Sequence, residues 1–164
     1  MKMRSLALLA FASLVLASSL DAQELGISVG DKAPGGVLET LDGKKVDIGT
    51  YLGKQPVLIQ FWATWCGNCK ALEPQLKTAL KKYRGKVSIV GVAVSYDQSP
   101  ARVKLFAKKH GLTHTILYDR TGDVSEAYEV PATSYIVVID RAGKVVYTGL
   151  GAKQDIEKAI RKAL

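Results

Sequence analysis

Apolar residues along the chain follow two periodicities, and their order predicts strands that alternate with helices. Residues 56–62 and 87–94 are almost continuously apolar, which is typical of strands buried on both faces of a sheet. Apolar residues spaced three and four apart predict a helix after each of these strands and another at the end of the chain. Ser99 and Pro100 supply the N-cap and the first-turn proline of the second helix.

Each of the three predicted helices carries one apolar face that can pack against a sheet. Pro74 lies inside the first helix and cannot donate to the carbonyl of Lys70, so we expect a kink there. The residues expected to face inward are Leu72, Leu76, Leu80 and Tyr83 in the first helix, Val103, Phe106 and Ala107 in the second, and Ile156, Ala159, Ile160, Ala163 and Leu164 in the last.

Two hairpins complete the expected sheet. Residues 35–48 form the first and turn at Asp42-Gly43, whereas 133–139 and 144–148 form the second. A short strand is expected at residues 113–117 and a short helix around residues 123–128. This order of elements predicts an α/β fold with a central mixed sheet and helices on both faces.

Residues 1–22 have the features of a secretory signal peptide. The basic residues Lys2 and Arg4 precede an apolar run of 12 residues, which is followed by small residues. We expect cleavage after Ser19 or after Ala22. Because such a run is short for crossing about 30 Å of hydrocarbon, a retained membrane anchor is the weaker alternative.

The remaining residues 23–164 are enough for one domain with its own core. The whole chain has a formal charge of +8, and about +7 remains without residues 1–22. Its lysines are spread over helices and turns without interleaved aromatic residues, so we expect a solvated basic surface and no nucleic-acid site. We expect a monomer that is periplasmic or secreted, in an oxidising compartment.

The chain has two cysteines, which lie in the segment Trp65-Cys66-Gly67-Asn68-Cys69, between a buried strand and a helix. The first turn of a helix favours a thiolate through its unpaired N–H groups and its dipole. The spacing lets Cys69 reach Cys66, so the pair can alternate between dithiol and disulfide and form a mixed disulfide with another protein. At the start of the helix, Cys66 is expected to attack and Cys69 to resolve.

Other uses of the cysteine pair are weaker hypotheses. A structural zinc site needs four ligands, and the only histidines, His110 and His114, lie far downstream, where we expect them to flank the short strand. A purely structural disulfide closing so short a loop would constrain the unfolded chain very little. Thiolates do suit Cu(I), but His114 is not at an evident loop apex from which it could join Cys66 and Cys69. We therefore expect no cofactor and no metal.

The segment from Phe61 to Lys70 resembles the active-site signature of thioredoxin-fold proteins. Further segments make the chain similar to the TlpA/ResA-like exported thiol-disulfide oxidoreductases, over about residues 30–164. These segments are the early hairpin with Leu41-Asp42-Gly43-Lys44, the insertion between Val94 and Thr113, and Val130-Pro131-Ala132-Thr133 followed by Ile139-Asp140 and Gly143-Lys144. The resemblance implies a thioredoxin-like fold with an N-terminal β-hairpin extension and thiol-disulfide oxidoreductase activity.

The same resemblance implies partners and docking residues. The partners would be exported proteins that contain disulfides or dithiols, including apocytochromes. The chain would reduce them with electrons from a membrane donor, and an oxidase or isomerase is the alternative. Pro131 would be a cis-proline facing the dithiol, and the backbone of Val130 would pair with an extended segment of the partner. Trp65, expected to be partly exposed, would support docking together with Gly67 and Asn68.

Three positions depart from the family pattern. Asn68 stands where many relatives have proline, and Gln60 stands where thioredoxins carry a buried aspartate. Leu72 stands where ResA-like members often have glutamate, with Glu73 one place along. We expect Gln60 to be a satisfied polar group in its strand and Glu73 to be solvated, which leaves the proton acceptor of Cys69 unassigned.

Overall fold

The structure is a computed structural model in which residues 25–164 are described, so the expected signal peptide lies outside the described residues. Each predicted strand and helix is present within a few residues of its expected bounds. The strands are β1 (Val37–Thr40), β2 (Lys45–Asp47), β3 (Val57–Trp62), β4 (Ser88–Val94), β5 (Thr115–Asp119), β6 (Tyr135–Ile139) and β7 (Val145–Leu150). The helices are α1 (Gly67–Lys82), α2 (Pro100–His110), α3 (Asp123–Ala127) and α4 (Ile156–Arg161), with a 3₁₀ turn η1 (Ile48–Tyr51).

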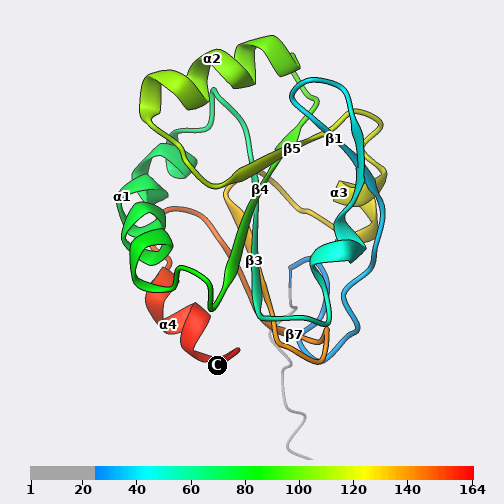
Figure 1. The fold of residues 1–164 in the computed structure, drawn as a ribbon, viewed down its shortest axis with the longest axis vertical. Coiled ribbons are helices and arrows are strands. Elements are labelled where there is room, and N and C mark those ends of the chain that lie inside the picture. Colours follow the sequence, from blue (N-terminus) through cyan, green and yellow to red (C-terminus); the bar gives the residue numbers. More distant parts are fainter. Residues whose placement is uncertain (1–24) are drawn as a thin grey trace, which may run out of the picture.

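The strands form one mixed sheet in the order β2-β1-β5-β4-β3-β6-β7 (Figure 1). Strand β3 lies in its interior, parallel to β4 on one side and antiparallel to β6 on the other. All six residues of β3 are buried, which explains the continuous apolar run. The early residues form the expected hairpin, in which β1 pairs with β2 and also extends the sheet beside β5.

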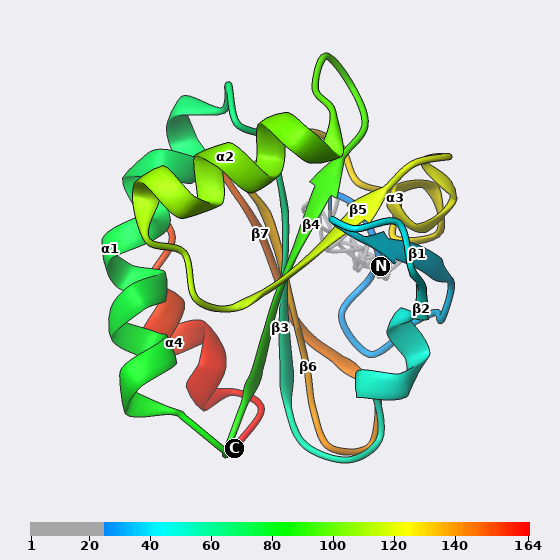
Figure 2. The ribbon, with the colours of Figure 1, turned by 45° about the horizontal axis from the view of Figure 1, so that its top comes forward.

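Helices cover both faces of the sheet (Figure 2). On one face, α1 and α4 pack over Leu58, Ile89 and Ile136, and α2 packs nearby over Trp62. On the other face, α3, η1 and the segment before β1 cover Phe61 and its neighbours. Burial of these two apolar layers supplies the main driving force for the fold.

The ends of the helices follow the expected signals, with one exception. The Ser99 side chain caps α2 by accepting from the backbone N–H of Arg102 at 3.3 Å, and Pro100 occupies the first turn. Leu164 was expected on the apolar face of α4, but it is 65% exposed. The expectation was wrong because the helix ends at Arg161, so the helical spacing no longer directs the last side chain inward.

Among residues 25–164, no helix combines the length and the apolar character needed to cross a membrane.

Candidate active site

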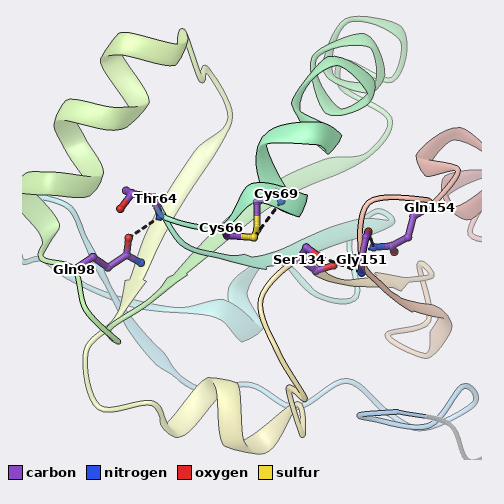
Figure 3. The surroundings of a disulfide bond; sticks show 7 residues. All are labelled: Thr64, Cys66, Cys69, Gln98, Ser134, Gly151 and Gln154. Carbon is purple, nitrogen blue, oxygen red and sulfur yellow. Dashed lines mark hydrogen bonds between the residues drawn. A yellow bond between two sulfur atoms is a disulfide. The ribbon is translucent and has the colours of Figure 1, made fainter.

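Cys66 and Cys69 form a disulfide at the junction of β3 and α1 (Figure 3). Their sulfur atoms are 2.00 Å apart and their Cα atoms 5.3 Å apart. Both residues are buried, whereas Gly67 and Asn68 between them are exposed. The turn between the two cysteines is therefore the exposed part of this junction.

Cys66 is the N-cap residue of α1 and has an extended backbone conformation. Its Sγ accepts a hydrogen bond from the backbone N–H of Cys69 at 3.1 Å. The first turn of α1 contains no acidic residue, so the unpaired N–H groups and the helix dipole act on this sulfur without a competing negative charge. A helix start of this kind is an environment in which thiolates are stabilised in proteins.

The loop that contains Tyr96 and Gln98 lies beside the cysteines and is held by two hydrogen bonds. The indole N–H of Trp65 donates to the carbonyl of Tyr96 at 3.0 Å, and the two rings meet edge to face. Gln98 accepts from the backbone N–H of Thr64 at 2.9 Å, on the side opposite Ser134 in Figure 3. Trp65 is 39% exposed, which confirms the expectation of partial exposure, and Tyr96 is 76% exposed. The loop therefore presents two aromatic rings to solvent near Cys66.

The segment that leads into β6 corrects one expectation. None of the peptide bonds in residues 25–164 is cis, so the bond before Pro131 is trans. The chain changes direction here through left-handed backbone at Glu129 and Ser134, with φ of 49° and 67°. Trans is the intrinsically favoured X-Pro isomer, and these two residues make the turn without a cis bond. Pro131 is exposed, and the N–H of Val130 is bonded to the carbonyl of Ser125 at 2.9 Å.

Ser134 lies beside the disulfide and is fixed by bonds in three directions (Figure 3). Its N–H donates to the carbonyl of Phe61, its hydroxyl accepts from the N–H of Gly151, and its carbonyl accepts from the Gln154 amide. These contacts tie the approach to β6 to both β3 and the chain after β7. The segment around Ser134, which lies beside Cys66, is therefore held in a fixed position.

A pocket of about 10 Å³ lies on the α1 side of the sheet and is lined in part by Cys69, Gln60 and Glu73. Glu73 is not the solvated residue expected from its place before a proline. Its side chain is only 16% exposed, and its carboxylate oxygens lie 3.0 and 3.1 Å from Nδ1 of His110. The expectation was wrong because the end of α2 lies against this part of α1, where Lys77 Nζ also donates to the carbonyl of His110 at 2.6 Å.

His114 lines the same pocket. It precedes β5, as expected, but its imidazole is turned inward. Burial lowers the pKa of His114 from 6.5 to about 4, because a charged ring loses hydration there. The ring is therefore neutral at pH 7.

Within residues 25–164, no three His, Cys, Asp or Glu side chains come together in a group that could hold a metal ion.

Sequence reasoning missed four residues around this site, namely Tyr96, Gln98, Ser134 and Gln154, and it named Glu73 and His110 without expecting their contact. Most of them lie far from the cysteines in the sequence and have no local motif. Ser134 alone had a signal, because it follows the Val130-Pro131-Ala132-Thr133 segment directly.

The residues that match a protein-family model are nearly the same as those that the structure describes. Residues 28–164 match the Redoxin family, and the chain belongs to this family. With its Cys66–Cys69 disulfide at the start of a helix, the chain is a thiol-disulfide oxidoreductase with a thioredoxin-like fold.

Two curated proteins illustrate the relationship. The chain is 33% identical over 141 residues to the Thioredoxin-like protein YneN of Bacillus subtilis (strain 168). This alignment covers 84% of this chain and 82% of that protein. It is 32% identical over 155 residues to the Thiol-disulfide oxidoreductase ResA of Geobacillus thermodenitrificans (strain NG80-2), covering 93% and 88% of the two chains.

Solved structures share the architecture. A secreted disulfide oxidoreductase of Mycobacterium tuberculosis, homologous to E. coli DsbE, superposes with a TM-score of 0.65 at 27% identity, covering 78% of this chain and 94% of that one. The thioredoxin domain of thiol-disulfide oxidoreductase BVU-2223 from Bacteroides vulgatus superposes with a TM-score of 0.72 at 21% identity, covering 84% and 99%, and at that identity it supports the fold alone.

Proposed function

We propose that the domain of residues 23–164 is an exported reductant of protein disulfides. Cys66 attacks a disulfide of the partner protein and Cys69 resolves the mixed disulfide. The observation that carries the assignment of roles is the hydrogen bond from the Cys69 N–H to Cys66 Sγ at the start of α1. A thiolate at Cys66 gains this donor and the helix dipole.

The partner is an exported protein that offers a disulfide, such as an apocytochrome, and it docks over the exposed residues around Cys66. Trp65, Gly67 and Asn68 form one side of this docking surface, and Pro131 and Val130 form the other. The Val130 N–H is engaged within the chain, so an extended partner segment would use its carbonyl. This is a more restricted form of strand addition than an edge with both groups free.

We infer export from the signal peptide at residues 1–22, which would be cleaved after Ser19 or after Ala22. The relative from Mycobacterium tuberculosis, described as secreted, is consistent with it. In a compartment held oxidising, a reductant has to be recharged, and we assign that task to a membrane electron donor.

The reduction potential of the Cys66–Cys69 pair tests the direction of electron flow. It can be measured by equilibrating the purified residues 23–164 with glutathione or dithiothreitol and counting free thiols. A value near −270 mV supports the reductant, whereas a value near −120 mV would make the chain an oxidase, by comparison with thioredoxin and DsbA.

A further inference from the structure

The net positive charge of the domain belongs to one part of the chain. Residues 67–113 contain ten Lys or Arg residues and two Asp or Glu residues, which gives this part a net charge of +8. The rest of residues 23–164 carries about −1, since the whole domain carries about +7. Helices α1 and α2 of this part lie on the same face of the sheet (Figure 2). The excess charge is therefore gathered on one side of the molecule.

Most of these ten cations have no anionic partner. Among the described residues, only Lys82 and Lys104 of the ten form ion pairs, with Glu157 and Asp42 respectively. Of the two acidic residues in this part of the chain, Glu73 has a side chain that is only 16% exposed. A surface whose charge is not neutralised from within attracts partners of the opposite charge.

Helix α2 presents part of this charge beside the disulfide. Its exposed cations Arg102, Lys108 and Lys109 lie three or four residues from Leu105, which is 70% exposed. At this spacing they surround the leucine on the surface of the helix. The helix begins directly after the loop that is hydrogen-bonded to the chain next to Cys66. A partner that meets Cys66 therefore has α2 at its side.

An open groove lies between the second half of α1 and the residues that lead into β5. Its volume of about 670 Å³ is in the range of clefts that bind ligands. Lys77, Lys81 and Arg84 line it together with the apolar side chains of Val87 and Ile89, and no described carboxylate does so. Such a lining suits a polypeptide segment in which acidic residues accompany apolar ones.

We infer that the unpaired cations of α2 and of the groove form a docking surface for an acidic segment of the partner protein. This basic face consists of Lys77, Lys81, Arg84, Arg102, Lys108 and Lys109. The inference rests on the proposed function and names the class of partner, a protein with acidic residues close to its disulfide. Opposite charges raise the rate of encounter, and contact with α2 then brings the partner's disulfide to Cys66.

An anionic membrane is the other partner that a basic face can meet, and two observations favour a protein. A helix that lies in a membrane interface inserts a wide apolar face. In α2 that face, with Val103 and Phe106, is packed over Trp62 instead, so Leu105 is its one large exposed apolar side chain. A flat bilayer also cannot enter the groove, whereas a segment of chain can.

Two disulfide peptides test the inference. Each has one internal disulfide and a short Gly-Ser linker, followed by a run of glutamates in the first peptide and of glutamines in its twin. Reduced residues 23–164 are mixed with each peptide, and mass spectrometry after acid quenching measures the reduced peptide. Rates with dithiothreitol correct for the reactivity of the peptides themselves.

The ratio of the two corrected rate constants measures the effect of the acidic segment. In about 0.01 M salt we expect the parent to reduce the acidic peptide about tenfold faster than its twin, at the lower end of the range for electrostatic steering. In about 1 M salt the Debye length falls to about 3 Å, so the ratio should approach one.

Charge-removing variants test whether the basic face causes this ratio. Arg102→Gln/Lys108→Gln/Lys109→Gln should remove most of the preference for the acidic peptide in low salt. Glutamine has a helix propensity similar to that of lysine and arginine, so the variant keeps α2 and loses its charge. Lys81→Gln/Arg84→Gln, which changes the groove, should lower the ratio about twofold because fewer charges are lost.

The matched control removes three positive charges elsewhere. Lys54, Arg141 and Lys144 are exposed and lie just before β3 and just after β6, at the ends of these strands away from Cys66. Lys54→Gln/Arg141→Gln/Lys144→Gln should keep the ratio of the parent. Thermal unfolding checks that every variant is folded.

Three outcomes overturn the inference. Equal rate constants for the two peptides in low salt would show that the parent does not recognise the acidic segment. An equal fall of the ratio in the α2 variant and in the control would assign the effect to net charge alone. Equal rate constants together with salt-sensitive sedimentation on phosphatidylglycerol vesicles would make a lipid surface the partner of the basic face. A parent that reduces neither peptide would contradict the proposed function itself.

Discussion

The backbone N–H of Cys69 donates to Sγ of Cys66 at 3.1 Å, so the sulfur that caps α1 is also one half of the disulfide. The helix begins at the cysteine pair, and its unpaired N–H groups face Cys66. Because one residue combines the two roles, the start of the helix and the chemistry of the sulfur cannot change independently.

This relationship predicts different behaviour for the two cysteines. Cys69→Ser should accumulate mixed disulfides with exported proteins through Cys66, because the attack remains and the resolving step is lost. Cys66→Ser should accumulate few, since its remaining thiol, Cys69, is not the N-cap sulfur that accepts a backbone N–H of the first turn. Non-reducing gels of both variants expressed with their signal peptide measure the trapped species. Equal trapping would contradict the assigned roles.

A second prediction concerns Asn68, whose backbone adds an N–H to the first turn of α1 where proline has none. Asn68→Pro should raise the pKa of the Cys66 thiol and lower the reduction potential of the pair. The shift should be on the order of 30 mV, or about 1.4 kcal/mol for two electrons, the scale of one net hydrogen bond. Equilibration of both proteins with dithiothreitol measures it. A potential equal to or above that of the parent would count against a role for this donor.

The third prediction concerns the hydrogen bond between Gln98 and the backbone N–H of Thr64. Gln98→Ala removes the acceptor of the Thr64 N–H, which belongs to a residue that is 5% exposed. An unsatisfied buried N–H should lower the free energy of unfolding by about 1–3 kcal/mol. Arg102→Ala removes a bond to the carbonyl of Asp97 at the exposed rim of the same loop, and it should change stability by less than about 0.5 kcal/mol. Urea denaturation compares the two variants. Equal losses of unfolding free energy in Gln98→Ala and Arg102→Ala would show that the hydrogen bond to Thr64 does not hold this loop in place.

A fourth prediction follows from the pKa of His114, which burial lowers from 6.5 to about 4. Between these pH values the unfolded chain binds a proton that the folded chain does not, so stability rises with pH through this window and is lost as the pH falls. The full effect is up to about 3 kcal/mol. Urea denaturation at pH 7 and at pH 4.5 should show a smaller loss for His114→Gln than for the parent.

His110→Gln is the control for this pH effect, because it removes a histidine of the neighbouring helix. It should retain the loss of stability that the parent shows. The side chains of Glu39, Asp42, Asp47 and Glu157 have lowered pKa values and also lose their contribution in acid, but they do so below their ordinary values of 3.8 to 4.5. An identical pH dependence in the parent and in His114→Gln would show that the ring is solvated.

Short-range patterns in the sequence were enough to predict the order of the elements and the place of the cysteines. Continuous apolar runs identify β3 and β4 because only strands covered on both faces need them, and Ser99-Pro100 identifies the start of α2 because its chemistry is local. The position of Cys66 at the start of α1 follows from the same local reasoning. The resemblance to TlpA/ResA-like proteins rested on these short-range patterns.

The surroundings of the cysteines could not be predicted in the same way, because they are made by residues from distant parts of the chain. The end of α2 brings His110 to Glu73 of α1, and Gly91 leaves room for the rings of His114 and Trp62 beside one pocket. The trans bond before Pro131 likewise depends on turns at Glu129 and Ser134, where resemblance had suggested a cis bond. These contacts join residues far apart in the chain, and no local propensity encodes them, because burial and orientation are properties of the assembled layers.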